Sequence, residues 1–357
     1  MPALQKLLSV PVRSDDAVEE QARRRLDALT KPPGSLGRLE ELLVRLCATQ
    51  GRCPPSLRDP VIFTLAGDHG VVSQGVSAYP QVVTAQMVEN FLNGGAAVNV
   101  LARLAGARVV VADLGVAAPL PAHPALRRHP VGAGTQDMTL GSAMTSAQAR
   151  QAVEAGIALV DEERGQGIDL VATGEMGIGN TTAASALVAA LTGAAPERVT
   201  GPGTGVDGDG RRRKVEAVRR ALEVNRPDAA NPLETLAKLG GFEIAGLVGV
   251  ILAGAVYRLP VVLDGFIAGA AALVAARLKP DIRGALIAAH RSSEPGHSIV
   301  LDTLGLEPYL DLQMRLGEGT GAALCIGLAR AASAVFTEMA TFKSAGVSDR
   351  AHPLGSP

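Results

Sequence analysis

Five short apolar runs recur along this chain, and most of them lead directly into a polar or glycine-rich loop. They cover residues 61–66, 108–114, 169–173, 261–263 and 285–289. Segments with apolar residues at helical spacing separate them. Strands that alternate with helices in this way are typical of proteins in which helices cover both faces of a parallel sheet. The sequence therefore predicts an α/β fold with a mainly parallel sheet flanked by helices, in a Rossmann-like, three-layer arrangement.

Helical segments before the first strand indicate a second, smaller unit. Residues 17–29 and 36–46 have helical periodicity, and the loop 31–37 between them is rich in Pro and Gly. We expect a small helical domain at 1–59, joined by a C-terminal helix within 331–357, and a larger α/β domain at 60–330. Further helices are expected at 84–104 with a bend at Gly94, at 146–164 with Ser146 as N-cap, and at 181–191, 211–224, 232–239, 242–257, 266–278 and 321–336.

The composition requires a core of small side chains. Ala occurs 59 times and Gly 41 times in 357 residues, whereas aromatic residues make up only 3%. A formal net charge of -1 and so few aromatics argue against nucleic acid or an anionic membrane surface as a partner. The chain is instead expected to act on small molecules.

The expected location is the cytoplasm. No apolar h-region follows the first residues, so an export signal is not indicated. The three Cys cannot form a disulfide framework and are expected as reduced thiols. The most apolar stretches, 244–257 and 266–278, are too short to span a bilayer.

Polar loops follow four of the predicted strands, at 67–70, 174–182, 264–265 and 290–294, and two more glycine-rich loops lie at 201–205 and 317–321. In open α/β sheets, ligands bind beyond the carboxyl ends of the strands. We therefore expect these loops to meet at one edge of the sheet and to form the functional site.

The loop 174–182 joins a predicted strand to a predicted helix and is a candidate anion site. Its glycines allow close approach of the backbone, and Asn180 and Thr181 supply donors at the helix start. The alternative is a tight turn with an ordinary N-cap. The glycine spacing differs from the dinucleotide motif G-x-G-x-x-G, and the Gly-Lys-Ser/Thr of a P-loop is absent.

Two charged residues near the other glycine-rich loops allow both a functional and a structural interpretation. Lys214 could reach back to a phosphate at the loop 201–205, or it could belong to a solvated face with the preceding arginines. Glu318, between two glycines, could be a general base with a pKa raised by apolar neighbours, or a turn residue in water. Glu175 is a second loop carboxylate at the same edge.

The histidines do not define a metal site. His69, His290 and His297 form no pair at metal-ligand spacing and lie in no dense cluster with Asp or Cys. Their roles stay open from the sequence.

Seven motifs occur together and in order. They are Lys31-Pro32-Pro33-Gly34-Ser35-Leu36-Gly37-Arg38-Leu39-Glu40, Asp68-His69-Gly70, the loop 174–182, Gly240-Gly241-Phe242-Glu243, Leu263-Asp264-Gly265-Phe266, Glu307-Pro308-Tyr309-Leu310 and Arg315-Leu316-Gly317-Glu318-Gly319. With them, the chain resembles the nicotinate-nucleotide–dimethylbenzimidazole phosphoribosyltransferase family of cobalamin biosynthesis over residues 29–336.

This resemblance implies a reaction and a set of site residues. Nicotinate mononucleotide would donate its phosphoribosyl group to 5,6-dimethylbenzimidazole, giving α-ribazole 5′-phosphate and nicotinate with inversion. Glu318 would be the general base and Glu175 would lie near the ribose. The phosphate and ribose would be bound by Lys214, Gly177, Asn180, Thr181 and Gly203, and the base by Tyr79, Thr84, Gln86, Met176 and Leu316.

The resemblance implies no metal and no cofactor, and it implies a homodimer. A related phosphoribosyltransferase with a different lower-ligand base is an alternative. So are an NAD-type oxidoreductase, which would need a dinucleotide motif, and a non-catalytic nucleotide-binding subunit, which would not need Glu318.

Overall fold

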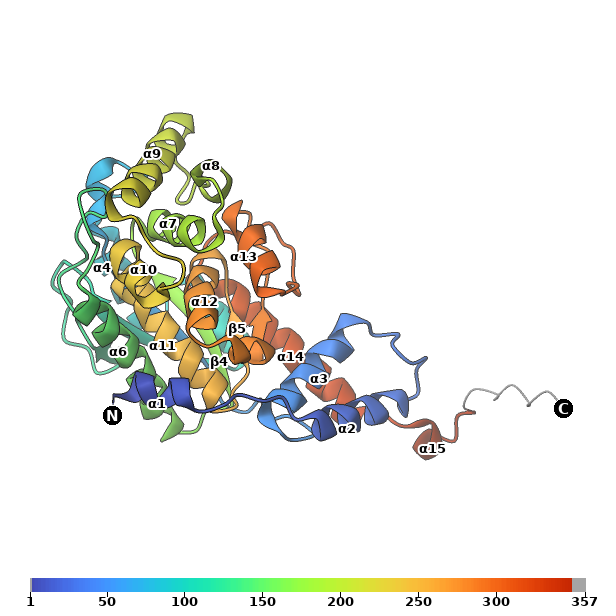
Figure 1. The fold of residues 1–357 in the computed structure, drawn as a ribbon. Helices are drawn as coiled ribbons and strands as arrows, with labels where there is room; N and C mark the ends of the chain where they lie inside the picture. The colour runs from blue at the N-terminus through green and yellow to red at the C-terminus, as the bar shows by residue number, and fades with distance from the viewer. Residues whose placement is uncertain (1, 349–357) are drawn as a thin grey trace.

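Six strands form one sheet in the order β3-β2-β1-β4-β5-β6, and every neighbouring pair is parallel. The structure is a computed structural model that describes residues 2–348 (Figure 1). The strands are β1 (Pro60–Gly67), β2 (Arg108–Gly115), β3 (Leu126–Arg128), β4 (Leu170–Met176), β5 (Val261–Leu263) and β6 (Leu286–Ala288). The predicted α/β fold with a parallel sheet is confirmed. The edge strand β3 was missed because two of its three residues are Arg, so no apolar run marks it.

Both faces of the sheet are covered, which explains why the strands other than β3 are mostly apolar rather than alternating with polar residues. In β1, Val61, Phe63 and Leu65 face one core, and Ile62 and Ala66 face the other. The first core is covered by α1 (Ala3–Ser9), α6 (Ser146–Arg164), α7 (Asn180–Thr192), α8 (Pro196–Val199), α9 (Gly208–Asn225), α10 (Pro232–Leu239), α11 (Phe242–Val256), α12 (Phe266–Leu278) and α13 (Gly296–Leu304). The second is covered by α3 (Arg38–Gln50), α4 (Val83–Leu92), α5 (Ala97–Ala105) and α14 (Thr320–Glu338).

Small residues allow the helices to pack at very short range. A Cβ atom at Gly156 of α6 would overlap the carbonyl of Gly246 in α11, and one at Gly249 would overlap the carbonyl of Val153. The backbones of α6 and α11 therefore touch, which accounts for the Ala- and Gly-rich core that the composition predicts.

Two helical predictions were wrong. The segment 84–104 forms two helices, α4 and α5, because the chain turns at Asn93–Ala96 with Gly94 in the left-handed region (φ 74°). The N-cap of α6 is Thr145, not Ser146, since the Thr145 side chain accepts the Gln148 N–H in a capping box.

A third apolar cluster lies away from the sheet. It joins α2 (Asp16–Asp27), α3 and the end of α14 through residues such as Leu26, Leu43 and Phe336, and Figure 1 shows α2 and α3 projecting from the sheet-containing body. The proposed division at residues 59 and 330 stays a prediction. Of the predicted C-terminal segment, α14 runs to Glu338 and α15 (Phe342–Ala345) follows, while residues 349–357 lie outside the described part.

One helix, α14, is long and apolar enough to cross a membrane by length and composition. Half of that segment is buried inside the protein, with residues such as Cys325 and Ile326 fully covered in the second core. A buried core helix accounts for its composition.

Candidate active site

The carboxyl end of β4 and the loops 201–205 and 315–319 surround a cavity of about 700 Å³. Its lining includes nine of the predicted site residues: Tyr79, Glu175, Met176, Gly177, Asn180, Thr181, Gly203, Leu316 and Glu318. The rest of the lining is Val83, Met87, Ile178, Thr204, Ile267 and Arg315. The loops 174–182, 201–205 and 317–321 thus meet as the sequence predicts, whereas the loops 67–70, 264–265 and 290–294 supply none of the lining residues.

Glu318 is held in an unusual backbone conformation at the edge of this cavity. Gly317, Glu318 and Gly319 have φ values of 81°, 65° and 100°, and a non-glycine residue in this region costs about 1–2 kcal/mol. The Thr64 hydroxyl donates a hydrogen bond to the Glu318 carbonyl (3.0 Å), and the Gly319 N–H donates to Asp264 Oδ2 (3.1 Å). These contacts fix the direction of the Glu318 side chain.

Glu318 is only 6% exposed, and few hydrogen bonds replace the water that its carboxyl group loses on burial. Its Oε2 has no hydrogen-bond partner among the described residues. Burial, with the nearby charge of Asp264, raises the pKa of Glu318 to about 7. A carboxyl group with this pKa can accept a proton near neutral pH.

Glu175, at the end of β4, lies next to Glu318. Asn180 Nδ2 donates a hydrogen bond to its Oε2, and its Oε1 lies against Gly317, where a Cβ atom would overlap it. Burial, followed by the charges of Asp264 and Glu243, raises the pKa of Glu175 to about 8. Near pH 7 most Glu175 side chains are protonated and can donate as well as accept a hydrogen bond.

Lys214 of α9 lies behind Thr181, which lines the cavity, and not on a solvated face. It is fully buried, and its Nζ donates to Thr181 Oγ1 (2.9 Å) at the start of α7. Burial lowers its pKa to about 8, although the charge of Glu294 opposes the shift. The lysine is thus a buried cation, with a hydroxyl group as its hydrogen-bond partner.

The Gly203 peptide beside Lys214 has both of its polar groups engaged. Its N–H donates to Glu294 Oε1 (2.8 Å), and its carbonyl accepts from Arg315 Nη1 (2.8 Å). The Gly203 N–H is therefore committed to Glu294 here, and a contact of Gly203 with phosphate stays a prediction. Glu294 and Arg315 lie in loops that the sequence analysis noted, but it assigned them no role.

The remaining predicted base-binding residues divide into two groups. Tyr79, Met176 and Leu316 line the cavity together with Val83 and Met87 of α4. Two others do not line it: Thr84 is buried, with its Oγ1 accepting the Ile178 N–H (3.1 Å), and Gln86 is exposed. Sequence reasoning missed Val83 and Met87, although their i,i+4 spacing places them on one helix face.

The histidines lie behind the site. His69 Nε2 is 2.7 Å from Glu243 Oε1, and both side chains are buried under the Gly177–Gly179 turn. His290 packs under the start of α14 with Nε2 at 3.9 Å from Asp264 Oδ1, and His297 Nδ1 accepts the Ser292 N–H. Among residues 2–348, no group of three His, Cys, Asp or Glu side chains has a metal-binding arrangement.

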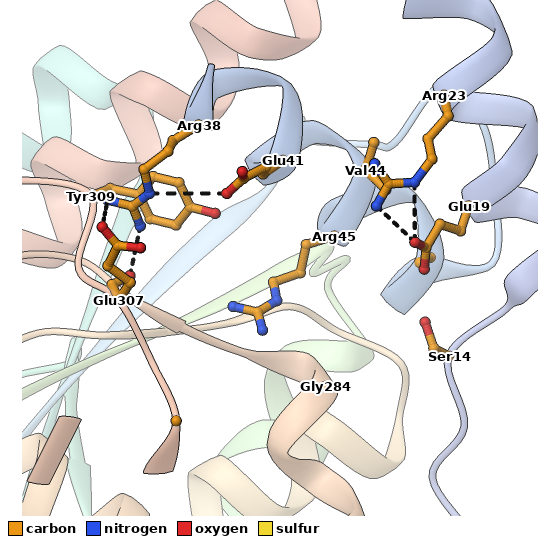
Figure 2. Close-up of a pocket in the computed structure, with 12 residues that line it drawn as sticks. Ser14, Glu19, Arg23, Arg38, Glu41, Val44, Arg45, Gly284, Glu307 and Tyr309 are labelled. Atoms are coloured by element: carbon orange, nitrogen blue, oxygen red, sulfur yellow. Dashed lines mark hydrogen bonds and ion pairs between the residues drawn. The ribbon is translucent and has the colours of Figure 1, made fainter. Parts of the chain in front are cut away.

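A second cavity, of about 450 Å³, lies between α3 and the segment around 305–309 (Figure 2). It contains none of the predicted site residues. Its charges are largely paired: Arg23 with Glu19 (2.9 Å), and Arg38 with Glu307 (3.4 Å) and over the ring of Tyr309. Figure 2 shows the Arg45 side chain extending into this space between the two pairs.

Comparison with known proteins gives a consistent result. A family model described as a phosphoribosyltransferase matches residues 12–347. A nicotinate-nucleotide–dimethylbenzimidazole phosphoribosyltransferase of Roseiflexus sp. (strain RS-1) is 56% identical over 336 residues, which cover 94% of this chain and 95% of that protein. The enzyme of the same name from Desulforamulus reducens is 52% identical and covers 98% of this chain and 99% of its own.

Solved structures agree. A crystal structure of the phosphoribosyltransferase of the same name from Thermus thermophilus superposes with a TM-score of 0.89 at 49% identity. The match covers 94% of this chain and all of the other.

Proposed function

This chain belongs to the nicotinate-nucleotide–dimethylbenzimidazole phosphoribosyltransferase family, and on that premise we propose that it moves phosphoribose from nicotinate mononucleotide to 5,6-dimethylbenzimidazole. The products are α-ribazole 5′-phosphate, nicotinate and a proton. One observation carries the proposal: a buried carboxyl group with a pKa of about 7, Glu318, opens onto the same cavity as Thr181, which Lys214 contacts.

The donor needs little help to lose its base. Its nicotinate ring is an N-ribosyl pyridinium, which leaves as a neutral ring nitrogen. The incoming benzimidazole nitrogen attacks the anomeric carbon from the opposite face, so the β configuration becomes α. The main tasks for the protein are to hold two flat molecules in line and to take up one proton.

Glu318 is the general base of this proposal. The attacking benzimidazole carries an N–H at its other nitrogen, and that proton passes to the Glu318 carboxylate as the new glycosidic bond forms. The raised pKa lies near neutral pH, and Glu318 lines the cavity in which the acceptor would bind.

Glu175 and Asn180 orient the ribose. They are hydrogen-bonded to one another and both line the cavity next to Glu318. The protonated Glu175 donates to a ribose hydroxyl group, while the Asn180 amide can accept from another.

The start of α7 and Lys214 bind the donor phosphate. Free N–H groups and the positive end of the dipole at a helix N-terminus favour an anion, and Gly177 gives close backbone access. The Lys214 ammonium group, behind Thr181, supplies a full positive charge to a dianionic phosphate.

The acceptor binds at the apolar end of the cavity. Tyr79, Val83, Met87, Met176 and Leu316 form a surface with few polar groups, which suits a flat benzimidazole with two methyl groups. A different flat base could use the same surface, so the related phosphoribosyltransferase stays the second candidate.

One experiment tests the function. The purified protein is mixed with nicotinate mononucleotide and 5,6-dimethylbenzimidazole, adenine or a phenol, and products are identified by mass and by the anomeric proton signal. We expect α-ribazole 5′-phosphate as the main product. Absence of a ribosylated base with every acceptor would contradict the proposal, and a preferred base other than dimethylbenzimidazole would favour the second candidate.

The homodimer and the cytoplasmic location are also part of the proposal. They rest on the family resemblance and on the sequence.

A further inference from the structure

Glu294 is a buried carboxylate next to the phosphate end of the cavity, and the mechanism above gives it no task. It is 4% exposed. Its Oε1 accepts the Gly203 N–H (2.8 Å), whereas Oε2 has no hydrogen-bond partner among residues 2–348. A Cβ atom at Gly201 would overlap Oε2, so the chain has a glycine where the carboxylate lies against the loop. A buried carboxylate oxygen without a hydrogen bond lowers the free energy of unfolding, so its presence requires an explanation.

Three charged groups from three segments meet at Gly203. Glu294 bonds to its N–H, Arg315 bonds to its carbonyl, and the Lys214 ammonium group packs against its Cα. The conformation of Gly203 is left-handed (φ 54°), so the direction of this peptide depends on these contacts. Glu294 does not line the large cavity but a small one of about 20 Å³, which shares Glu175, Thr181 and Arg315 with the large cavity.

Lys214 has few other charges near it. The helix α7 that packs against α9 carries no charged residue, and η1 (Gly70–Gln74) has none either. The neighbouring charges on α8, α9 and α10 bond to other groups. On α9, Arg211 donates to the carbonyls of Glu197 and Thr200, and Arg213 donates to the carbonyl of Gly75. Glu197 of α8 pairs with Arg219, and Glu234 of α10 pairs with Lys238. Glu294 is the acidic group whose charge favours protonated Lys214, and Arg315 adds a positive charge on the other side of Gly203.

We infer that Glu294 is a positioning residue for donor binding: its carboxylate orients the Gly203 peptide and keeps the buried Lys214 protonated, without touching the donor. The inference deepens the proposed function and rests on it, because it assumes that Lys214 binds the donor phosphate. It accounts for a negative charge next to a phosphate site, since a neutral lysine would lose its ionic attraction for the phosphate.

The test compares the donor KM of Glu294→Gln with that of the unchanged protein from pH 6 to pH 9, with nicotinate mononucleotide varied at saturating acceptor. The amide oxygen can still accept the Gly203 N–H, so the variant removes the charge and keeps the hydrogen bond. Without the carboxylate the Lys214 pKa falls further, and the lysine loses its proton at a lower pH. For a fall of one pKa unit, we expect the ratio of the Glu294→Gln KM to the KM of the unchanged protein to rise from near one at pH 6 to about fivefold at pH 8 and about tenfold at pH 9. Titration of the donor phosphate and of Glu318 affects both proteins and cancels in the ratio.

Glu216→Gln is the matched control, since it removes an exposed carboxylate two residues from Lys214 on the same helix. Its KM ratio should stay near one at every pH. A Glu294→Gln ratio that is constant with pH, whether near one or uniformly raised, would overturn the inference, because a purely structural role predicts no titration. If Glu294→Gln does not fold, Glu294→Asp, which keeps the charge, is compared with Glu294→Asn in the same way.

Lys214→Ala separates this inference from the proposed function. If that variant leaves the donor KM unchanged, the assignment of Lys214 to the phosphate fails and the role of Glu294 fails with it. If Lys214→Ala raises the KM but the Glu294→Gln ratio is constant with pH, only the role of Glu294 is lost.

Discussion

We call the part of the cavity at Glu318 its acidic end, and the part at Thr181, behind which Lys214 lies, its basic end. Burial moves both charged groups, Glu318 and Lys214, towards neutrality. At one end the pKa of Glu318 rises to about 7, and at the other the pKa of Lys214 falls to about 8. Within the described residues 2–348, Glu318 Oε2 has no hydrogen-bond partner, and the acids Glu175 and Asp264 lie nearby. Lys214, by contrast, bonds to the Thr181 hydroxyl group and has the compensating charge of Glu294 near it. These two environments suit two different tasks. A general base such as Glu318 has to gain a proton during the reaction, whereas a phosphate-binding cation such as Lys214 has to stay protonated.

The largest effect is expected at the acidic end. Glu318→Gln removes the proton acceptor and keeps the shape, so we expect kcat to fall about 10²- to 10⁴-fold with both KM values nearly unchanged. Steady-state kinetics with each substrate varied in turn measures this. Glu338→Gln, an exposed change at the C-terminal end of α14, the helix that begins just after Glu318, is the control. A kcat within a few-fold of the unchanged protein would rule out Glu318 as the base.

The next largest effect is expected at the basic end, and it should appear in the donor KM rather than in kcat. Lys214→Ala removes a charged hydrogen-bond donor worth about 1.5–3 kcal/mol, which corresponds to a donor KM raised roughly 10- to 150-fold. The acceptor KM should change little. Arg212→Ala, an exposed residue two positions away, should leave both constants unaltered. If Lys214→Ala lowered kcat and left the donor KM unchanged, the basic end would serve the chemical step and not donor binding.

The pH dependence distinguishes the ends without mutation. Glu318 has to be ionised to accept a proton, so kcat should rise with pH through about 7 and then level off. Lys214 has to be protonated, so the donor KM should rise above about pH 8. Initial rates from pH 5.5 to pH 9.5 at varied donor concentration give both curves. A kcat that is flat across pH 7 would contradict the assignment of Glu318.

The smallest effect is expected where the acceptor binds. Met87→Ala removes apolar surface from the cavity wall. If one or two of the lost groups contact the acceptor, the acceptor KM should rise about fourfold to fifteenfold at about 0.8 kcal/mol per group. Gln86→Ala is the informative partner, because Gln86 is predicted from the sequence but is exposed and off the wall. We expect it to leave the acceptor KM unchanged. If Gln86→Ala raised the acceptor KM more than Met87→Ala does, Gln86 and not Met87 would be the base-binding residue.

Local patterns were sufficient for most of the fold. Buried parallel strands are apolar on both faces, so β1, β2, β4, β5 and β6 are visible as apolar runs. Errors arose where a short element carries no such run, as in β3, or where one loop interrupts a continuous helical pattern, as between α4 and α5. In both places the tertiary contacts, not the local residues, decide the structure.

The sequence by itself brought the loops 174–182, 201–205 and 317–321 together, because parallel strands end at one edge of the sheet and these loops carry Glu175, Glu318 and the start of α7. Only the tertiary structure decided which side chains face the cavity and which lie behind it. Lys214 belongs to a run of basic residues that is typical of a solvated face, yet packing against α7 buries it completely. Glu294 lies 80 residues further along the chain, and its charge matters to Lys214 through space, which no local pattern records. The physical reason is that burial and electrostatic coupling depend on the distance between atoms and not on their separation along the chain.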